Sequence, residues 1–189
     1  MPLPREERYT YADLLHWDEG ERWELIDGVP SMLASPTYAH QMIVGEIHRQ
    51  VATYLRGKTC KAVMSPFDVR LFETENSSET DVNTVVIPDM SIICDRSKLD
   101  NRGCKGAPDM VVEVLSPSTQ RQDRLVKLKL YQKAGVREYW IVDPDSKTVQ
   151  VYLLKNGLLQ ITEVYSAEDQ AKVNVLDACL VDLKQVFEN

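Results

Sequence analysis

One acidic residue, Glu113, lies inside an apolar run, and no other feature constrains the fold of this chain as strongly. The run extends from Met110 to Leu115 and has the length and β-branched content of a buried strand. A carboxylate at such a position costs several kcal/mol unless it is paired with a cation or binds a metal. The run therefore predicts a core strand and a candidate site at the same place.

Two other charged residues are predicted to lie close to Glu113. The apolar segment from Val85 to Ile93 carries one acid, Asp89, and a neighbouring strand can place it beside Glu113. On a helix over residues 118–134, Lys127 lies near the centre of the apolar face, where an ammonium needs a carboxylate or phosphate partner or must extend to solvent. These positions predict a metal-assisted hydrolytic site. The structural alternatives are a salt-bridged core acid, an acid near a strand edge and a lysine that extends to solvent.

The composition limits the chemistry of such a site. With 22 basic and 29 acidic side chains, the net charge is −7, which argues against a broad electrostatic footprint for nucleic acid. Three histidines and four separated cysteines resemble neither a zinc site nor a disulfide framework, and Cys94 and Cys179 are expected to be buried thiols. Oxygen ligands, and therefore Mg²⁺ or Mn²⁺, match the available acids better.

The length and the apolar segments give expectations about organisation and location. A chain of 189 residues fits a single domain over residues 1–189. No apolar stretch approaches the ~20 residues of a membrane span, and residues 1–7 contain no apolar signal core. We therefore expect a cytoplasmic protein with no membrane contact.

The order of predicted elements indicates an α/β fold. Turn and capping signals separate these elements: a helix over 10–17, a hairpin over 22–33, a helix over 36–57, strands over 61–65 and 68–72, a loop over 73–84, a strand over 85–94, a loop over 95–107, a strand over 110–115, a helix over 118–134, and strands over 138–142, 148–154 and 159–165. The strand–helix–strand unit predicts a parallel pair, and the later hairpins predict antiparallel additions. The expected result is a mixed sheet flanked by helices.

An ordered set of short motifs resembles a known nuclease superfamily. Pro88-Asp89, then Val112 to Ser118, then Lys127 resemble the PD-(D/E)XK nucleases, the restriction-endonuclease-like superfamily. More closely, residues 8 to 185 are similar to a bacterial family of unknown function described as putative restriction endonucleases. The resemblance implies a restriction-endonuclease-like core with extra C-terminal antiparallel strands. It also implies a Mg²⁺-dependent endonuclease, with Mn²⁺ as a substitute, that acts on nucleic acid, with DNA the expected substrate.

The resemblance also implies roles for particular residues. Leu115 stands where the superfamily pattern has its lysine, and the closer family takes that lysine from the following helix, as Lys127. Glu24 joins the site from the N-terminal region; without the resemblance it reads as an exposed strand acid. The implied catalytic residues are Asp89, Glu113, Lys127 and Glu24, and the implied metal ligands are Asp89, Glu113, Glu24 and the carbonyl group of Val114.

Several alternatives stay open at this point. His40 lies on the apolar face of its helix, either near the site or, as we favour, as a hydrogen-bonded core histidine. The acidic surface and the displaced lysine also fit a nuclease-fold module that acts in binding or assembly without catalysis. The three C-terminal strands could serve a homodimer with Trp140 or Tyr152 in the contact, which is compatible with either function.

Overall fold

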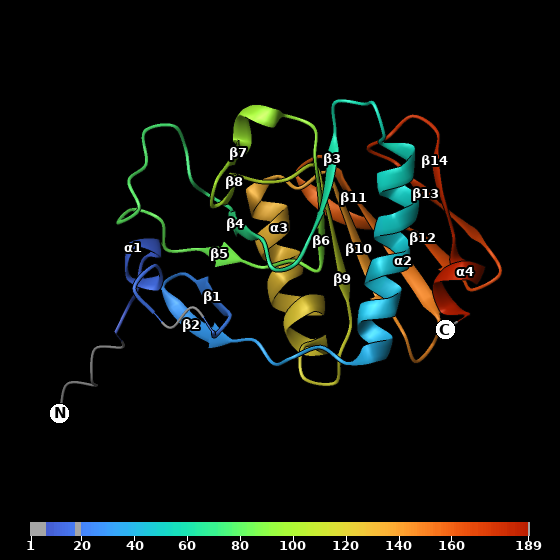
Figure 1. Cartoon of the computed structure of the whole chain (residues 1–189), viewed down its shortest axis with the longest axis horizontal. Helices are drawn as coiled ribbons and strands as arrows, with labels where there is room; N and C mark the ends of the chain where they lie inside the picture. Colours follow the sequence, from blue (N-terminus) through green and yellow to red (C-terminus); the bar gives the residue numbers. More distant parts are fainter. Residues whose placement is uncertain (1–6, 18–19, 189) are drawn as a thin grey trace.

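The computed structural model describes residues 7–17 and 20–188, and two six-stranded sheets with a helix between them dominate the fold (Figure 1). The first sheet has the strand order β2-β1-β5-β4-β8-β7, in which β4 and β8 are parallel. Its strands are β1 (Trp23–Ile26), β2 (Val29–Met32), β4 (Asp68–Arg70), β5 (Val85–Val86), β7 (Leu99–Asp100) and β8 (Gly103–Lys105).

The second sheet contains the strand that carries Glu113. Its order is β12-β11-β10-β9-β6-β3, with one parallel pair, β9 and β10, in which Val112 lies opposite Trp140. Its strands are β3 (Lys61–Met64), β6 (Met90–Ile93), β9 (Met110–Val114), β10 (Glu138–Asp143), β11 (Thr148–Lys155) and β12 (Leu158–Ser166). The connection between β9 and β10 is helical, which confirms the predicted parallel pair and the mixed sheet.

Helices cover both faces of the second sheet. The helical segments are α1 (Tyr11–Leu14), α2 (Tyr38–Tyr54), the 3₁₀ turn η1 (Arg96–Lys98), the π-helical segment η2 (Gln122–Lys127), α3 (Leu128–Ala134) and α4 (Leu183–Phe187). Helix α2 begins at the predicted place because the Thr37 hydroxyl accepts the His40 N–H at 3.2 Å. Its buried face, which includes Ile47 and Val51, packs with one face of the sheet, while α3 lies between the two sheets (Figure 1).

The structure corrects two predicted elements and adds others that were not predicted. The single strand over residues 85–94 is wrong, because the chain turns at Ile87-Pro88-Asp89 and separates β5 in one sheet from β6 in the other. The segment over residues 95–107 is not an irregular loop, since it contains η1, β7 and β8. The elements after β12 were not predicted. They are a two-stranded sheet of β13 (Gln170–Val173) and β14 (Cys179–Asp182), followed by helix α4.

The cysteines differ from the expectation. Cys60 immediately precedes Lys61 of β3, and Cys94 immediately follows Ile93 of β6, the residue paired with Lys61. The two cysteines form a disulfide with a Cα–Cα distance of 3.8 Å. The prediction of a free thiol at Cys94 is therefore wrong, because strand pairing brings together two cysteines that are 34 residues apart. Cys104 and Cys179 are buried thiols, and for Cys179 this confirms the prediction.

Trp140 cannot form the contact suggested for a homodimer. Its side chain is completely buried in the core, and its indole N–H donates to Glu138 Oε1 at 2.7 Å. No helix in the described ranges 7–17 and 20–188 is long and apolar enough to cross a membrane. Residues 1–6, on which the expectation of no signal segment rests, lie outside the described residues.

Candidate active site

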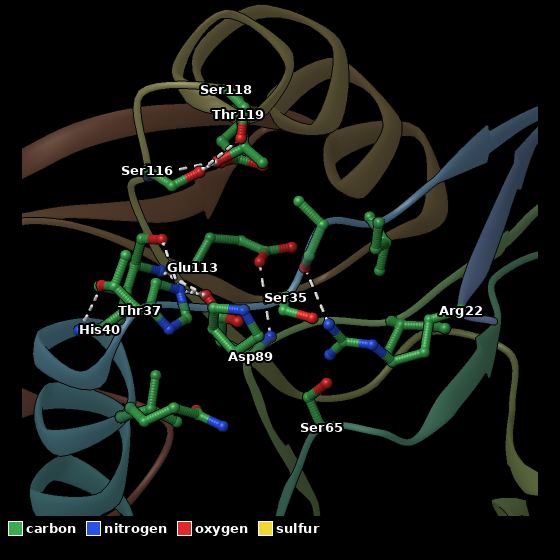
Figure 2. A pocket seen from close by; sticks show the side chains of 18 of the residues that line it. Arg22, Ser35, Thr37, His40, Ser65, Asp89, Glu113, Ser116, Ser118 and Thr119 are labelled. Atoms are coloured by element: carbon green, nitrogen blue, oxygen red, sulfur yellow. Dashed lines mark hydrogen bonds and ion pairs between the residues drawn. The ribbon is translucent and has the colours of Figure 1, made fainter. Parts of the chain in front are cut away.

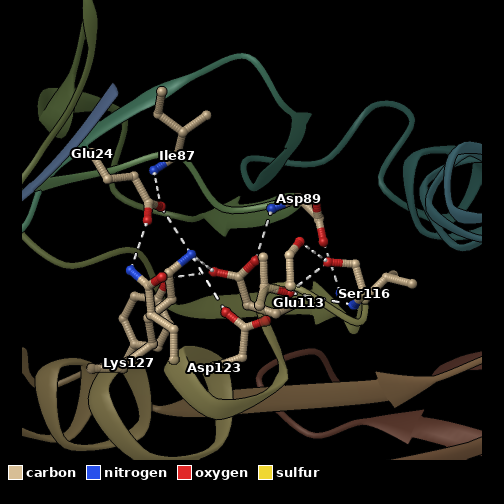
Figure 3. Close-up of polar contacts among 12 residues, drawn as sticks. Glu24, Ile87, Asp89, Glu113, Ser116, Asp123 and Lys127 are labelled. Atoms are coloured by element: carbon tan, nitrogen blue, oxygen red, sulfur yellow. Dashed lines mark hydrogen bonds and ion pairs between the residues drawn. The ribbon is translucent and has the colours of Figure 1, made fainter. Parts of the chain in front are cut away.

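The two predicted acids meet where the turn before β6 passes the end of β9. Asp89 immediately precedes β6, and Met90 lies opposite Val112 in the antiparallel pair of β6 and β9. The backbone N–H of Val114 donates to Asp89 Oδ2 at 2.7 Å, and the backbone N–H of Asp89 contacts Glu113 Oε2 at 3.4 Å (Figures 2 and 3). The turn that breaks the predicted strand is therefore the feature that carries Asp89 to Glu113.

Lys127 is surrounded by three buried carboxylates. Its Nζ lies 2.9 Å from Glu24 Oε1, 3.0 Å from Glu113 Oε1 and 3.6 Å from Asp123 Oδ1 (Figure 3). We call these four residues the acid–lysine cluster. The Lys127 side chain is 4% exposed, so the alternative of an ammonium extended into solvent is wrong.

The acid–lysine cluster contains three carboxyl groups and one amino group. Burial raises the pKa of the Glu113 carboxyl well above its usual value, although Lys127 opposes the shift. Burial also raises the pKa of Asp123, again against the effect of Lys127. Burial alone would lower the pKa of Lys127, but Glu113, Glu24 and Asp123 together raise it well above its usual value. Lys127 is therefore an ammonium at neutral pH. Burial disfavours the ionised forms of Glu113 and Asp123.

Glu24 belongs to the cluster through Lys127. It is fully buried, so its reading as an exposed strand acid is wrong. The backbone N–H of Ile87 donates to its Oε1 at 3.0 Å, and Gln122 Nε2 contacts its Oε2 at 3.4 Å. In Figure 3, Glu24 and Asp89 lie on opposite sides of the cluster. Glu24 is thus a partner of Lys127, and its role as a metal ligand stays a prediction.

The helix that carries Lys127 departs from α-helical geometry at this point. The segment η2 is π-helical and continues directly into α3. An ideal α-helical projection places Val126 on the packed face, but its side chain is 44% exposed, while Asp123 and Lys127 are buried. The π-helical turns change the angular spacing of the side chains, which explains the error. Tyr131, one turn later, donates its hydroxyl to Glu113 Oε1 at 2.7 Å and so adds a contact that the sequence did not reveal.

His40 extends from α2 to the same place. Its Nε2 lies 3.1 Å from Asp89 Oδ2 and 3.0 Å from the carbonyl oxygen of Val114 (Figure 2). Because a carbonyl oxygen can only accept, Nε2 is the protonated nitrogen in this arrangement. His40 Nδ1 is buried and has no hydrogen-bond partner in the described part of the chain. His40 therefore lies at the candidate site. From its helix position we favoured the other alternative, a hydrogen-bonded core histidine.

A cavity of about 430 Å³ opens beside these groups. Asp89, Glu113, Val114, His40 and Lys127 line it, whereas Glu24 does not. Loops on both sides supply hydroxyl groups, and Figure 2 labels Ser35, Ser65 and Ser116 among them. The cavity therefore combines acidic groups at its base with a polar, hydrogen-bonding rim.

The oxygen donors at the cavity form only part of the ligand set that a divalent cation needs. Within residues 7–17 and 20–188, no three side chains of His, Cys, Asp and Glu converge as a complete metal site. One reason is that Glu113 Oε1 is already bound to Lys127 and Tyr131. The acidic residues that line the cavity are Asp89, Glu113 and Asp123, and the carbonyl oxygen of Val114 lies beside Asp89 and His40. Such a partial oxygen set suits Mg²⁺, which keeps several waters and binds through one or two carboxylates and substrate phosphates.

Comparisons with known proteins agree with the fold. An uncharacterized protein of Synechocystis is 27% identical over 154 residues, which cover 80% of this chain and 75% of that protein. The crystal structure of a putative nuclease belonging to DUF820 from Anabaena variabilis superposes with a TM-score of 0.69 and 22% identity, covering 95% of this chain and 98% of the other. The model of the Uma2 family matches residues 10–182. The chain therefore belongs to the Uma2 family, whose members are described as putative restriction endonucleases.

Proposed function

We propose that the protein is a metal-dependent nuclease that hydrolyses phosphodiester bonds of nucleic acid, with DNA as the expected substrate. One observation carries the proposal: three buried carboxylates of the acid–lysine cluster share one ammonium beside an open cavity. Buried negative charge without a counter-ion is costly, so the arrangement favours a bound cation. The Uma2 family description and the fold of the Anabaena putative nuclease support the same activity class.

The residues that would hold the cation are Asp89, Glu113 and the Val114 carbonyl group. When bound, Mg²⁺ or Mn²⁺ supplies charge neutralisation at the scissile phosphate and a water of lowered pKa. Asp89 is oriented for this role because the Val114 N–H fixes one of its carboxylate oxygens. Tyr131 and Lys127 fix Glu113 in the same way. His40 would help to orient Asp89 and the Val114 carbonyl group, because its Nε2 contacts both oxygens.

Lys127 acts as an electrostatic residue in this proposal. Its three carboxylate neighbours keep it protonated, which argues against a role as the general base. An ammonium at the edge of the cavity can instead stabilise the negative charge that develops on a phosphate during attack. Of the roles that a lysine could take here, charge stabilisation is the one that its environment supports.

The direct test is cleavage of plasmid and oligonucleotide substrates with Mg²⁺ or Mn²⁺. Asp89→Asn and Glu113→Gln are expected to lower kcat/KM by at least about 100-fold, because each removes a charged ligand. Asp145→Asn is a matched control, since Asp145 also follows a proline but lies exposed in the β10–β11 turn. It should cleave like the wild type.

A binding measurement separates catalysis from contamination. Calorimetric titration of Mn²⁺ should give a site in the wild type and in Asp145→Asn, and no site in Asp89→Asn. If all four proteins cleave equally, the activity comes from a contaminant and the proposal fails. If none binds Mn²⁺ or cleaves, the chain is a nuclease-fold module that acts in binding or assembly.

A further inference from the structure

Within residues 7–17 and 20–188, Arg22 lines the cavity as a cation without a neighbouring carboxylate. Two basic side chains, Arg22 and Lys127, line the cavity. Lys127 is already paired with the three carboxylates of the acid–lysine cluster. Among the described residues, no carboxylate lies within ion-pair distance of Arg22, and its Nη2 donates a hydrogen bond to the carbonyl oxygen of Ala34 at 2.8 Å. A guanidinium has five N–H donors, so four remain for a ligand.

The position of Arg22 matches a place for an anion. It precedes β1, the strand that carries Glu24, and Figure 2 shows its guanidinium directed toward the part of the cavity that contains Asp89. The bond to Ala34 holds the planar group in one orientation, which lowers the entropy lost when it binds. The hydroxyls of Ser35 and Ser65 lie on either side in the same view and can also donate to phosphate oxygens.

We infer that Arg22 binds a phosphate of the nucleic acid strand next to the one that is cleaved. This inference rests on the proposed nuclease function and adds the substrate contact. The two parallel N–H donors of a guanidinium form bidentate hydrogen bonds with a phosphate, which a lysine cannot do. In a protein of net charge −7, such a local cation offsets the repulsion between the acidic surface and the substrate. Arg22 is a substrate-positioning residue, and it orients the strand over Asp89 and Glu113.

The first test is binding of a labelled oligonucleotide in Ca²⁺, which avoids turnover. Arg22→Gln should weaken binding several-fold and lower the slope of log K against log salt by about one, because one phosphate contact is lost. Arg22→Lys should recover part of the affinity and the slope, because it keeps the charge and loses the fork. Arg56→Gln is the matched control, since Arg56 is exposed and does not line the cavity.

The second test identifies the phosphate. Neutral methylphosphonate is introduced at successive positions around the cleaved bond, and KM is measured for each oligonucleotide. At one position the substitution should raise the KM of the wild type and leave that of Arg22→Gln unchanged. Thermal melting of each variant confirms folding.

The failures of the two hypotheses are distinguishable. If Arg22→Gln binds and cleaves like Arg56→Gln while Asp89→Asn is inactive, the role of Arg22 is refuted and the nuclease function stands. If Asp89→Asn is as active as the wild type, the nuclease function fails, and the salt slope still decides whether Arg22 contacts phosphate. A wild type that does not bind the oligonucleotide overturns the inference about Arg22 directly.

Discussion

Replacing Lys127 by methionine tests the charge balance of the acid–lysine cluster independently of activity. The substitution keeps an unbranched side chain that is one atom shorter, and it removes the ammonium that contacts Glu24, Glu113 and Asp123 at 2.9, 3.0 and 3.6 Å. Three buried carboxylates cannot stay ionised together without a cation, so we expect one of them to take up a proton for the positive charge lost.

The cost of that proton gives the magnitude. A carboxyl group with an unfolded pKa of about 4.3 is protonated at a cost of about 1.4 kcal/mol for each pH unit above it. The variant should therefore be less stable than the wild type by at most about 4.4 kcal/mol at pH 7.5 and about 1.6 kcal/mol at pH 5.5. Because the pKa values of Glu113 and Asp123 are already raised in the wild type, the measured losses should be smaller than these limits. The sign follows because the folded pKa of this carboxyl group is raised above its unfolded value. The variant therefore has its full stability below about pH 4.3, and it loses free energy of unfolding as the pH rises toward the folded pKa.

Urea denaturation at both pH values, with EDTA in the buffer, measures the two differences. Lys129→Met is the matched control, because Lys129 is exposed on the same helix, and it should change the free energy of unfolding by less than about 0.5 kcal/mol. The double variant Lys127→Met/Glu113→Gln should recover part of the loss at pH 7.5. An equal loss at pH 7.5 and 5.5, or a loss below about 1 kcal/mol at pH 7.5, would refute the argument.

Two further predictions concern the scaffold. Gly103→Ala should destabilise the protein by about 2–4 kcal/mol in urea denaturation, because Gly103 has a φ of 144° and a Cβ there would overlap the Asp68 carbonyl oxygen; a change below about 1 kcal/mol would contradict this. Burial raises the pKa of the Cys104 and Cys179 thiols to about 11, so neither should react with a thiol reagent at pH 8 in the native state. The unfolded chain should show two reactive thiols before reduction of the disulfide and four after it. The stability that the two buried thiols contribute should be present below pH 9 and lost as the pH rises through about 11.

Strong local patterns predicted the elements that build the core. The apolar run around Glu113 forms β9, and the strand–helix–strand order gives the parallel pair of β9 and β10. The Thr37 cap and the apolar face of α2 appear where their spacing places them. These features depend on residues close together in the sequence, which is why a pattern can reveal them.

Contacts between distant segments were not predictable in the same way. The Cys60–Cys94 disulfide depends on the pairing of β3 with β6, and the break before Asp89 depends on β5 and β6 joining different sheets. The exposure of Val126 follows from the π-helical geometry of η2, which no α-helical projection contains. Each outcome is decided by packing between elements, and local propensity carries no information about it.

For the site, the sequence by itself determined that Glu113 needs a partner, because a carboxylate in a buried strand must be compensated. It also singled out Asp89 and Lys127 as candidates. Only the tertiary structure decided that Lys127 binds three carboxylates, that His40 reaches Asp89 and that Glu24 lies on the far side of the cluster. Burial can be read from the composition of a segment, whereas the distance between two charges depends on how strands and helices pack.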